Sequence, residues 1–405
     1  MKLKLLIIIG IISAFLIAGC TQPKTVDDST VTPEAVKAVV DANNQFALDY
    51  YSKIISDTNI FFSPYSISTA LAMTYEGAKG QTADEMKSVF HYPDIDIMRP
   101  AYANIYNEIN KKGKEYKLST ANALWAQEDY TFLPEYFSTI NQFYGGEVTN
   151  LNFKTETEKS RVTINNWIED QTNDKIKDLI GKGDLKEATR LVLTNAIYFK
   201  GTWLKKFKKS NTRDQDFKVN NEKTVTVPMM TLGGEEANFN YLGIQDLQIL
   251  ELPYSGEELS MLILLPKGDL TNLESELSIE NINQWRAMLK EQNIRVSLPK
   301  FKFETKNYMA EDLIGMGMPT AFSNDADFSG MDGTLKLKID KVIHQAFVEV
   351  NEEGTEAAAA TAVIMIEKSM AMPTEFKADH PFIFLIQQKD TGNILFMGKV
   401  TDPTK

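Results

Sequence analysis

Few side chains of this 405-residue chain have the types and spacing that catalysis needs. The three histidines, His91, His344 and His380, lie far apart and lack the H-E-x-x-H spacing of helical zinc sites. Cys20 is the only cysteine, which excludes cysteine zinc clusters and an intrachain disulfide. We therefore expect no metal site and no cofactor.

Serine chemistry is poorly supported as well. The chain has no G-x-S-x-G elbow and no Gly-rich phosphate loop. Ser297 and Lys300 match the S-x-x-K pattern of β-lactamases and penicillin-binding proteins, but Pro299 disrupts the helical turn that would bring the two side chains together. The K-T-G partner motif of those enzymes is missing. The sequence therefore predicts a protein that is not an enzyme.

A more unusual segment follows residue 351. Residues 352–362 read EEGTEAAAATA, and alanine on propensity alone favours a helix. Small side chains could also slide between existing strands, because they add little bulk to the faces of a sheet. Residues 363–366 favour a strand, and residues 370–373 are typical of an exposed loop. Composition alone favours a surface helix or linker, and helix, loop and strand all remain open.

Helices are predicted in the first quarter of the chain. Apolar residues at helical spacing predict a helix over residues 33–53, with Thr32 as its cap. Ser63 and Pro64 predict the start of a second helix that ends at Gly77, and a third is expected over residues 81–90.

Strands are predicted later. Residues 191–199, 259–265 and 382–387 are almost entirely apolar or β-branched, as in strands buried on both faces. Residues 336–350 alternate as a long strand would. Helices and strands mix without regular alternation, so the sequence predicts an α+β fold of mixed sheets surrounded by helices, in one compact domain.

The formal net charge of −12 limits the partners of the protein. Nucleic-acid binding needs a concentrated positive surface, so no nucleic-acid partner is expected. Lysine runs at 205–209 and 111–114 are interpreted as solvated surface, with a polyanion site as the alternative.

The N-terminus has the order of parts of a signal peptide. Lys2 and Lys4 precede an uncharged apolar stretch over residues 5–17. The following LIAGC resembles the lipobox of prokaryotic lipoproteins, which implies cleavage before Cys20 and lipidation of its sulfur. We expect a signal peptide at 1–19, a lipidated cysteine and flexible tether at 20–34, and one domain at 35–405. An ordinary signal peptide that happens to contain Cys20 is the alternative. The expected location is the cell surface, with a membrane anchor.

Five sequence blocks together resemble the serpin family. Residues 352–361 are similar to the hinge of inhibitory serpins, and residues 376–385, FKADHPFIFL, to the signature after the reactive loop. Further blocks are NIFFSPYSI at 59–67, LTNAIYFKGTW at 193–203 and FSNDADFSG at 322–330. They stand in family order and span roughly residues 35–403. The resemblance implies the serpin fold: a large central sheet A with smaller sheets, about eight or nine helices, and an exposed reactive-centre loop at about 354–376.

The resemblance also implies a function. A serpin offers a substrate-like bond to a serine or cysteine protease and traps the acyl-enzyme by inserting the cleaved loop into sheet A. The hinge comprises Glu352, Gly354, Thr355, Glu356, Ala357, Ala358, Ala359, Ala360 and Thr361. Period-2 alternation predicts an inward set without charge: Thr355, Ala357, Ala359, Thr361, Val363 and Met365.

Family spacing from Gly354 places the reactive bond between Lys368 and Ser369. A lysine there favours a trypsin-like target protease, whose specificity pocket holds an acid. Met370 or Met372 as bait would favour chymotrypsin- or subtilisin-like enzymes. A monomer is expected, and a non-inhibitory serpin-fold binding protein is the alternative function.

Two polar clusters are implied by the same resemblance. The shutter, beneath the opening sheet, comprises Ser63, Ser66, Asn195 and His344. The breach, at the top of the sheet where insertion begins, comprises Trp203, Lys300 and Glu352. A Lys300–Glu352 ion pair is expected to hold the hinge closed until cleavage.

Overall fold

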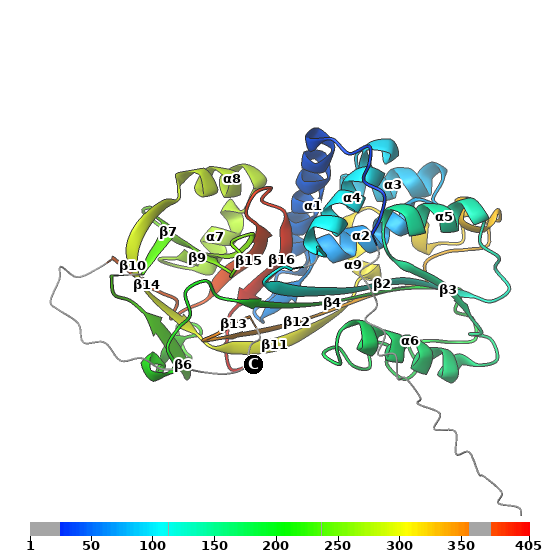
Figure 1. Cartoon of the computed structure of the whole chain (residues 1–405). Coiled ribbons are helices and arrows are strands. Elements are labelled where there is room, and N and C mark those ends of the chain that lie inside the picture. The colour runs from blue at the N-terminus through cyan, green and yellow to red at the C-terminus, as the bar shows by residue number, and fades with distance from the viewer. Residues whose placement is uncertain (1–24, 112, 236, 356–373) are drawn as a thin grey trace, which may run out of the picture.

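The computed structural model describes residues 25–111, 113–235, 237–355 and 374–405. A ten-stranded sheet has the order β1-β16-β15-β9-β8-β7-β10-β6-β5, with β14 paired to β10, and a six-stranded sheet has the order β11-β12-β13-β4-β2-β3 (Figure 1). The strands of the larger sheet are β1 (Ile60–Phe62), β5 (Arg213–Lys218), β6 (Thr224–Leu232), β7 (Asn238–Gly243), β8 (Leu247–Pro253), β9 (Leu259–Pro266), β10 (Lys290–Pro299), β14 (Thr374–Lys377), β15 (Phe382–Gln388) and β16 (Ile394–Val400). Those of the smaller are β2 (Tyr116–Gln127), β3 (Glu147–Leu151), β4 (Leu191–Thr202), β11 (Phe301–Tyr308), β12 (Lys341–Asn351) and β13 (Gly354–Thr355).

Ten α-helices lie in the described part of the chain. They are α1 (Pro33–Ile54), α2 (Pro64–Tyr75), α3 (Gly80–Phe90), α4 (Ile95–Ile109), α5 (Pro134–Phe143), α6 (Thr157–Gln171), α7 (Leu270–Glu276), α8 (Ile279–Met288), α9 (Ala310–Met316) and α10 (Ser329–Asp332). Two 3-10 turns, Lys209–Asn211 and Thr320–Phe322, complete the set. Helices α1 to α5 cover one face of the six-stranded sheet, and α6 covers the other (Figure 1).

The predicted helices and strands are found with small shifts at their ends. Thr32 caps α1 by accepting from the Ala35 amide at 3.2 Å, and Ser63 caps α2. The strand expected from residue 336 begins only at Lys341. The physical reason is that the Ile339 amide bonds the carbonyl of Ala321, in a 3-10 turn, and contact with β4 begins only where the Asp340 amide donates to the Leu191 carbonyl.

Two apolar clusters fill the two faces of the six-stranded sheet. The main core runs from Ala35 in α1 to Val400 in β16. A smaller cluster lies under α6, where Ile164 and Ile168 meet Val192 of β4 and Ile343 of β12. The smaller cluster therefore crosses the boundary between β4 and β12.

The segment before α1 differs from the expected flexible tether. Val26 is buried, and its backbone exchanges hydrogen bonds with the Asn107 side chain of α4 at 3.1 and 2.8 Å. The amide of Asp27 donates to the carbonyl of Gln142 in α5 at 2.7 Å. Residues 26–28 are thus fixed to α4 and α5, because one apolar side chain and several polar groups in this polar segment find partners there.

Candidate functional site

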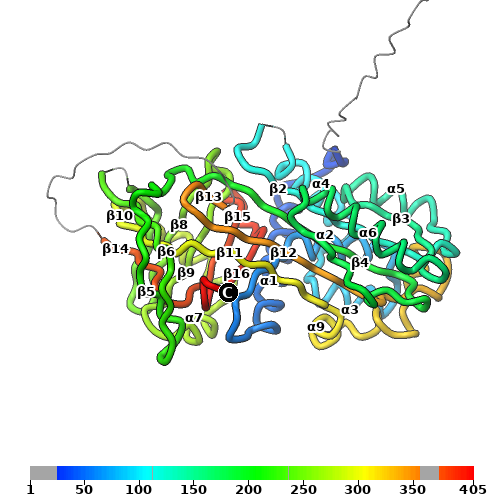
Figure 2. The backbone as a smooth tube through the Cα atoms, turned by 90° about the horizontal axis from the view of Figure 1, so that it is seen from below, coloured from blue at the N-terminus to red at the C-terminus, as the bar shows by residue number. Residues whose placement is uncertain are grey.

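The boundary between β4 and β12 is a seam that is closed along most of its length and filled at one end. Residues 341–347 of β12 pair in parallel with residues 192–198 of β4. Beyond this stretch the strands separate, and β13 lies between them, with Thr355 opposite Gly201 of β4 and Val350 of β12. Figure 2 shows β13 at the end of the sheet nearer β14. The chain after Asn351 therefore turns back and begins a strand inside the sheet.

Gly354 makes this entry possible. Its φ is +153°, and a Cβ added there would lie 2.0 Å from the Gly201 carbonyl oxygen and 2.7 Å from Thr202 Cα. Only a residue without a side chain fits so close to a neighbouring backbone.

Gly354→Ala is expected to destabilise the native protein by about 2 kcal/mol, because both the clash and the backbone angle oppose alanine. Thermal unfolding compared with Gly268→Ala would test this, since Gly268 faces open space. Equal melting temperatures for the two variants would contradict the assigned fit.

Thr355 is held by an aromatic pair. Its hydroxyl lies 2.8 Å from the Tyr254 hydroxyl, and the Tyr254 ring stacks on Trp203 with centroids 4.7 Å apart. All three side chains are buried. The side chain of Thr355 therefore points into the main core, which is the inward orientation expected from the sequence.

The two glutamates before Gly354 are tied to the surrounding strands. Lys300 Nζ lies 2.9 Å from Glu352 Oε2, and the Thr212 hydroxyl donates to Glu352 Oε1 at 2.8 Å. Burial alone would raise the pKa of Glu352, but the bonds from Lys300 and Thr212 lower it overall. Glu353 pairs with Lys206 at 2.9 Å. These ion pairs fasten the turn between β12 and β13.

A polar cluster lies within the closed part of the seam. Ser63 Oγ donates to the carbonyl of Leu395 at 2.6 Å, and Asn195 Nδ2 donates to Ser66 Oγ at 2.6 Å. The Ser63 amide donates to His344 Nε2 at 3.1 Å, while His344 Nδ1 bonds Asn195 Oδ1. Since Asn195 lies on β4 and His344 on β12, this bond joins the two sides of the seam.

His344 is neutral in this arrangement. Its Nε2 accepts a hydrogen bond from the Ser63 amide, so Nδ1 carries the hydrogen that is donated to Asn195. Complete burial lowers the pKa of His344 to about 3. Protonation would place an uncompensated charge in the seam.

Comparison with known proteins identifies the family. The model of the family described as serpin (serine protease inhibitor) matches residues 41–403. The chain belongs to the serpin family. An uncharacterized serpin-like protein of Methanosarcina acetivorans is 40% identical over 421 residues, covering 99% of this chain and 98% of that protein. Human leukocyte elastase inhibitor is 41% identical over 380 residues, covering 89% of this chain and 98% of the inhibitor.

Solved structures agree with this assignment. Uncleaved ovalbumin is similar with a TM-score of 0.81 and 33% identity, covering 90% of this serpin and 100% of the ovalbumin chain. Human thyroxine-binding globulin in complex with its hormone gives a TM-score of 0.83 and 30% identity, covering 92% and 100%. The predicted α+β serpin fold is therefore confirmed.

The structure brings together most of the residues that the family resemblance suggested. Lys300 and Glu352 form the expected ion pair. Trp203 Nε1 donates to the carbonyl of Asn351 at 3.0 Å, so the three breach residues lie around one turn. Residues Glu356–Thr361 of the hinge, the reactive bond Lys368–Ser369 and the lipidation site Cys20 lie outside the described residues.

Two contributors were missed from the sequence. Asn122 Oδ1 in β2 accepts from both Ser66 Oγ at 3.0 Å and Asn195 Nδ2 at 2.6 Å, which makes it a member of the shutter. Tyr254, which holds Thr355, was missed as well. A buried position facing Asn195 becomes visible only when the register of β2 and β4 is known.

The described residues contain neither a membrane-spanning helix nor a cluster of metal ligands. No described helix of this serpin is long and apolar enough to span a bilayer. Within the same residues, no group of three or more histidine, cysteine, aspartate or glutamate side chains is arranged to hold a metal ion.

Proposed function

We propose that this serpin inhibits a serine-type protease as a suicide substrate, with Lys368–Ser369 as the cleaved bond. The observation that carries the proposal is the position of Gly354 and Thr355, which already occupy the first places of a strand between β12 and β4. The family is described as serine protease inhibitors, and the human relative is named for elastase inhibition.

The chemistry is ordinary acyl transfer followed by arrest. The protease nucleophile attacks the Lys368 carbonyl carbon, the amine of Ser369 leaves with a proton, and an ester joins Lys368 to the protease. Insertion of the freed loop then carries the protease away and distorts its active site before water cleaves the ester. The serpin supplies the bait and the moving strand, and the protease supplies the catalytic groups.

The topology of the seam favours insertion. The β4–β12 pairing is parallel, whereas β13 is antiparallel to both neighbours. A strand that continues β13 therefore replaces one parallel pairing by two antiparallel pairings, which are more stable per residue. In the same register Thr361 arrives opposite Asn195 and His344, so its hydroxyl replaces the bond that is broken when the seam opens.

Incubation of residues 21–405 with trypsin tests the proposal. We expect a band at the summed mass that survives denaturing electrophoresis, and a released fragment that begins at Ser369. Lys368→Ala should remove the trypsin complex, because the acid in the specificity pocket of trypsin loses its cationic partner. Cleavage at Met370 or Met372 by a chymotrypsin- or subtilisin-like enzyme with a stable complex would instead identify those enzymes as targets.

Glu352→Ala is expected to speed spontaneous loop insertion on warming about tenfold, because it releases the bond to Lys300 and leaves the hinge less constrained. The matched control is Glu349→Ala, which breaks the nearby Lys302–Glu349 pair between β11 and β12 without touching Glu352. Conversion to a heat-resistant form, followed on native gels, is the measurement. Unchanged conversion by Glu352→Ala would count against the pair as a lock.

A non-inhibitory role is the second candidate. The fold is shared with thyroxine-binding globulin, whose structure holds a hormone. Cleavage of the loop without a stable complex and without a rise in melting temperature would favour such a binding protein.

We also propose export and anchoring through a lipid on Cys20, on the basis of the lipobox. Metabolic labelling with a fatty acid should mark the wild type and leave Cys20→Ser unmarked. If neither protein is labelled, the lipid anchor is refuted and the N-terminal segment is an ordinary signal peptide that contains Cys20.

A further inference from the structure

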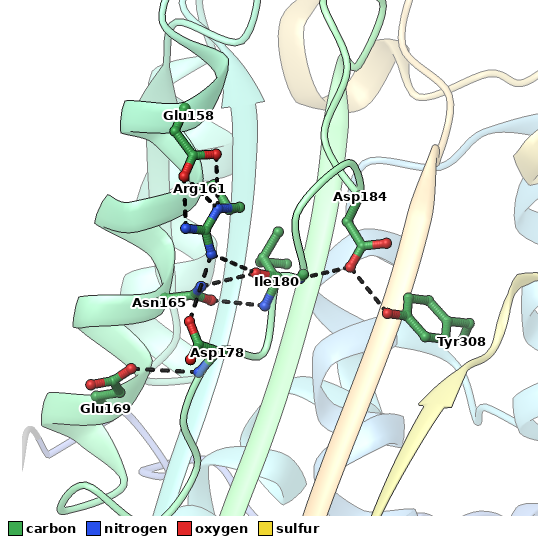
Figure 3. A network of polar contacts seen from close by, with 9 residues as sticks. Glu158, Arg161, Asn165, Glu169, Asp178, Ile180, Asp184 and Tyr308 are labelled. Carbon is green, nitrogen blue, oxygen red and sulfur yellow. Dashed lines mark hydrogen bonds and ion pairs between the residues drawn. The ribbon is translucent and has the colours of Figure 1, made fainter.

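The segment between α6 and β4, residues 172–190, forms a strap over the seam. The strap is attached to α6 at Ile180 (Figure 3). Asn165 of α6 holds the Ile180 backbone through both its amide, at 2.8 Å, and its carbonyl, at 2.9 Å. Arg161 donates to the same carbonyl at 3.1 Å. Ile180 itself is fully buried in the apolar cluster under α6. The part of the strap around Ile180 therefore moves with α6.

The strap reaches the far side of the seam at its last residue, where the Arg190 amide donates to Asp340 Oδ2 at 2.5 Å, and also through the carboxylate of Asp184. Asp184 Oδ2 accepts from the Gly181 amide at 2.7 Å and from the Tyr308 hydroxyl of β11 at 3.0 Å. Its second oxygen lies 3.5 Å from Lys341 Nζ at the start of β12. Figure 3 shows Asp184 pointing away from α6 toward Tyr308. Asp184 thus connects the strap to the strands on the far side of the seam.

The contacts of Ile180 and Asp184 attach the strap to opposite sides of the seam. Helix α6 packs against β2, where Trp167 meets Trp125 with ring centroids 5.3 Å apart, and β2 pairs with β4. Tyr308 and Lys341 belong to β11 and β12. A new strand between β4 and β12 separates the two sides by about 4.8 Å, one strand spacing. A hydrogen bond of 3.0 Å does not survive that displacement.

The register shows when this bond must break. Along the antiparallel register of β13, residue 361 reaches Asn195, residue 362 reaches Ile343, and residue 364 reaches Lys341. Ile343 is also the residue of β12 that pairs with Tyr308. The first half of the hinge therefore enters without disturbing Asp184, and only residues from 362 onward must pass it.

The side chains of the inserting segment become larger and more apolar beyond residue 362. On the face opposite the inward set, Glu356 is followed by the small residues Ala358, Ala360 and Ala362, and the large residues Ile364 and Ile366 come last. In the register of β13, Ala362 reaches the level of Ile343 and Ile364 that of Val192, both in the apolar cluster under α6. An exposed row of this kind would be unfavourable, so the strap must close again over the inserted strand.

We propose that Asp184 is a positioning residue that latches the strap to β11 and β12 and sets the rate of the second half of loop insertion. The inference rests on the proposed insertion mechanism and assigns its late step to one carboxylate. Release of Tyr308 and Lys341 admits residues 362–366, and the apolar contact of Ile364 with the cluster under α6 then favours closure.

Two labelled peptides separate the early step from the late one. A peptide of residues 355–361 ends before the latch, and a peptide of residues 355–367 passes it. Their association rates are measured with the uncleaved wild type, Asp184→Asn and Asp178→Asn. Asp178 lies in the same strap, and its carboxylate pairs with Arg161 of α6, so its variant is a matched control that leaves the Asp184 contacts intact.

Asp184→Asn is expected to bind the longer peptide about fivefold faster than the wild type and the shorter peptide at an unchanged rate. Tyr308→Phe, which removes one hydroxyl, should give a smaller acceleration in the same direction. Asp178→Asn should change neither rate. Equal acceleration of both peptides would overturn the latch in favour of general loosening, and equal rates for wild type and Asp184→Asn would also overturn it. Failure of both peptides to bind the wild type would refute the insertion mechanism itself.

Discussion

Thr355→Arg is expected to turn the inhibitor into a substrate, cleaved by the target protease but unable to retain it. Thr355 points into the main core and bonds the buried Tyr254, so arginine would bring an unpaired charge into that position. Burying such a charge costs several kcal/mol, enough to slow insertion at least about 100-fold. Hydrolysis of the acyl-enzyme would then finish first.

Denaturing electrophoresis after mixing with the protease gives the result directly. The variant should yield only the cleaved serpin, and its melting temperature should not rise after cleavage. Thr355→Ser keeps the hydroxyl that meets Tyr254 and should retain complex formation. A denaturation-stable complex of Thr355→Arg in wild-type yield would show that trapping does not require an uncharged buried side chain at position 355.

Acid is expected to destabilise the native protein through His344. Its pKa is lowered by burial to about 3, whereas an unfolded histidine titrates near its usual value of about 6.5. Between these values the unfolded chain binds one more proton, so stability is full above pH 6.5 and falls as the pH is lowered toward 3. The folding equilibrium changes by up to about tenfold per pH unit.

The difference between wild type and His344→Gln isolates this contribution. Glutamine can accept from Ser63 and donate to Asn195, as the neutral ring does, but does not titrate. His380 has the opposite sign: burial would lower its pKa, but the bonds to Asp379 and Pro266 raise it overall. Its contribution is complete below pH 6.5 and is lost as the pH rises through the raised value. Denaturant unfolding between pH 4 and 6.5 should therefore show a flatter profile for His344→Gln, and parallel profiles would exclude His344.

The local structure was largely predictable because it depends on short-range pattern. Thr32 caps α1 and Ser63 caps α2, since the preference of these residues for caps is local. The buried strands β4, β9 and β15 were equally clear from apolar runs. The predicted start of β12 at residue 336 was wrong, because the strand begins at Lys341. Alternation of apolar and polar residues indicates burial of one face, but it does not indicate whether the backbone pairs with a neighbouring strand.

The site could be predicted only where a family motif exists. Ser66, Asn195 and His344 were found through the resemblance, but Asn122 and Tyr254 were not, because their roles depend on which strands are neighbours. Asp184 lies in a polar connection whose sequence gives no signal. Its importance follows from reaching Tyr308, 124 positions away in the chain.

The fixed segment at Val26 has a consequence for the direction in which the inhibitor faces. Five residues separate Cys20 from Val26, so the chain between them spans at most about 20 Å. A lipid on Cys20 would therefore hold the side bearing α4 and α5 close to the bilayer. Strand β14 lies at the other end of the molecule, and β13 lies between the two ends (Figure 1, Figure 2). With that geometry the end of the molecule that carries β14 faces away from the bilayer, toward proteases that arrive from the surrounding medium.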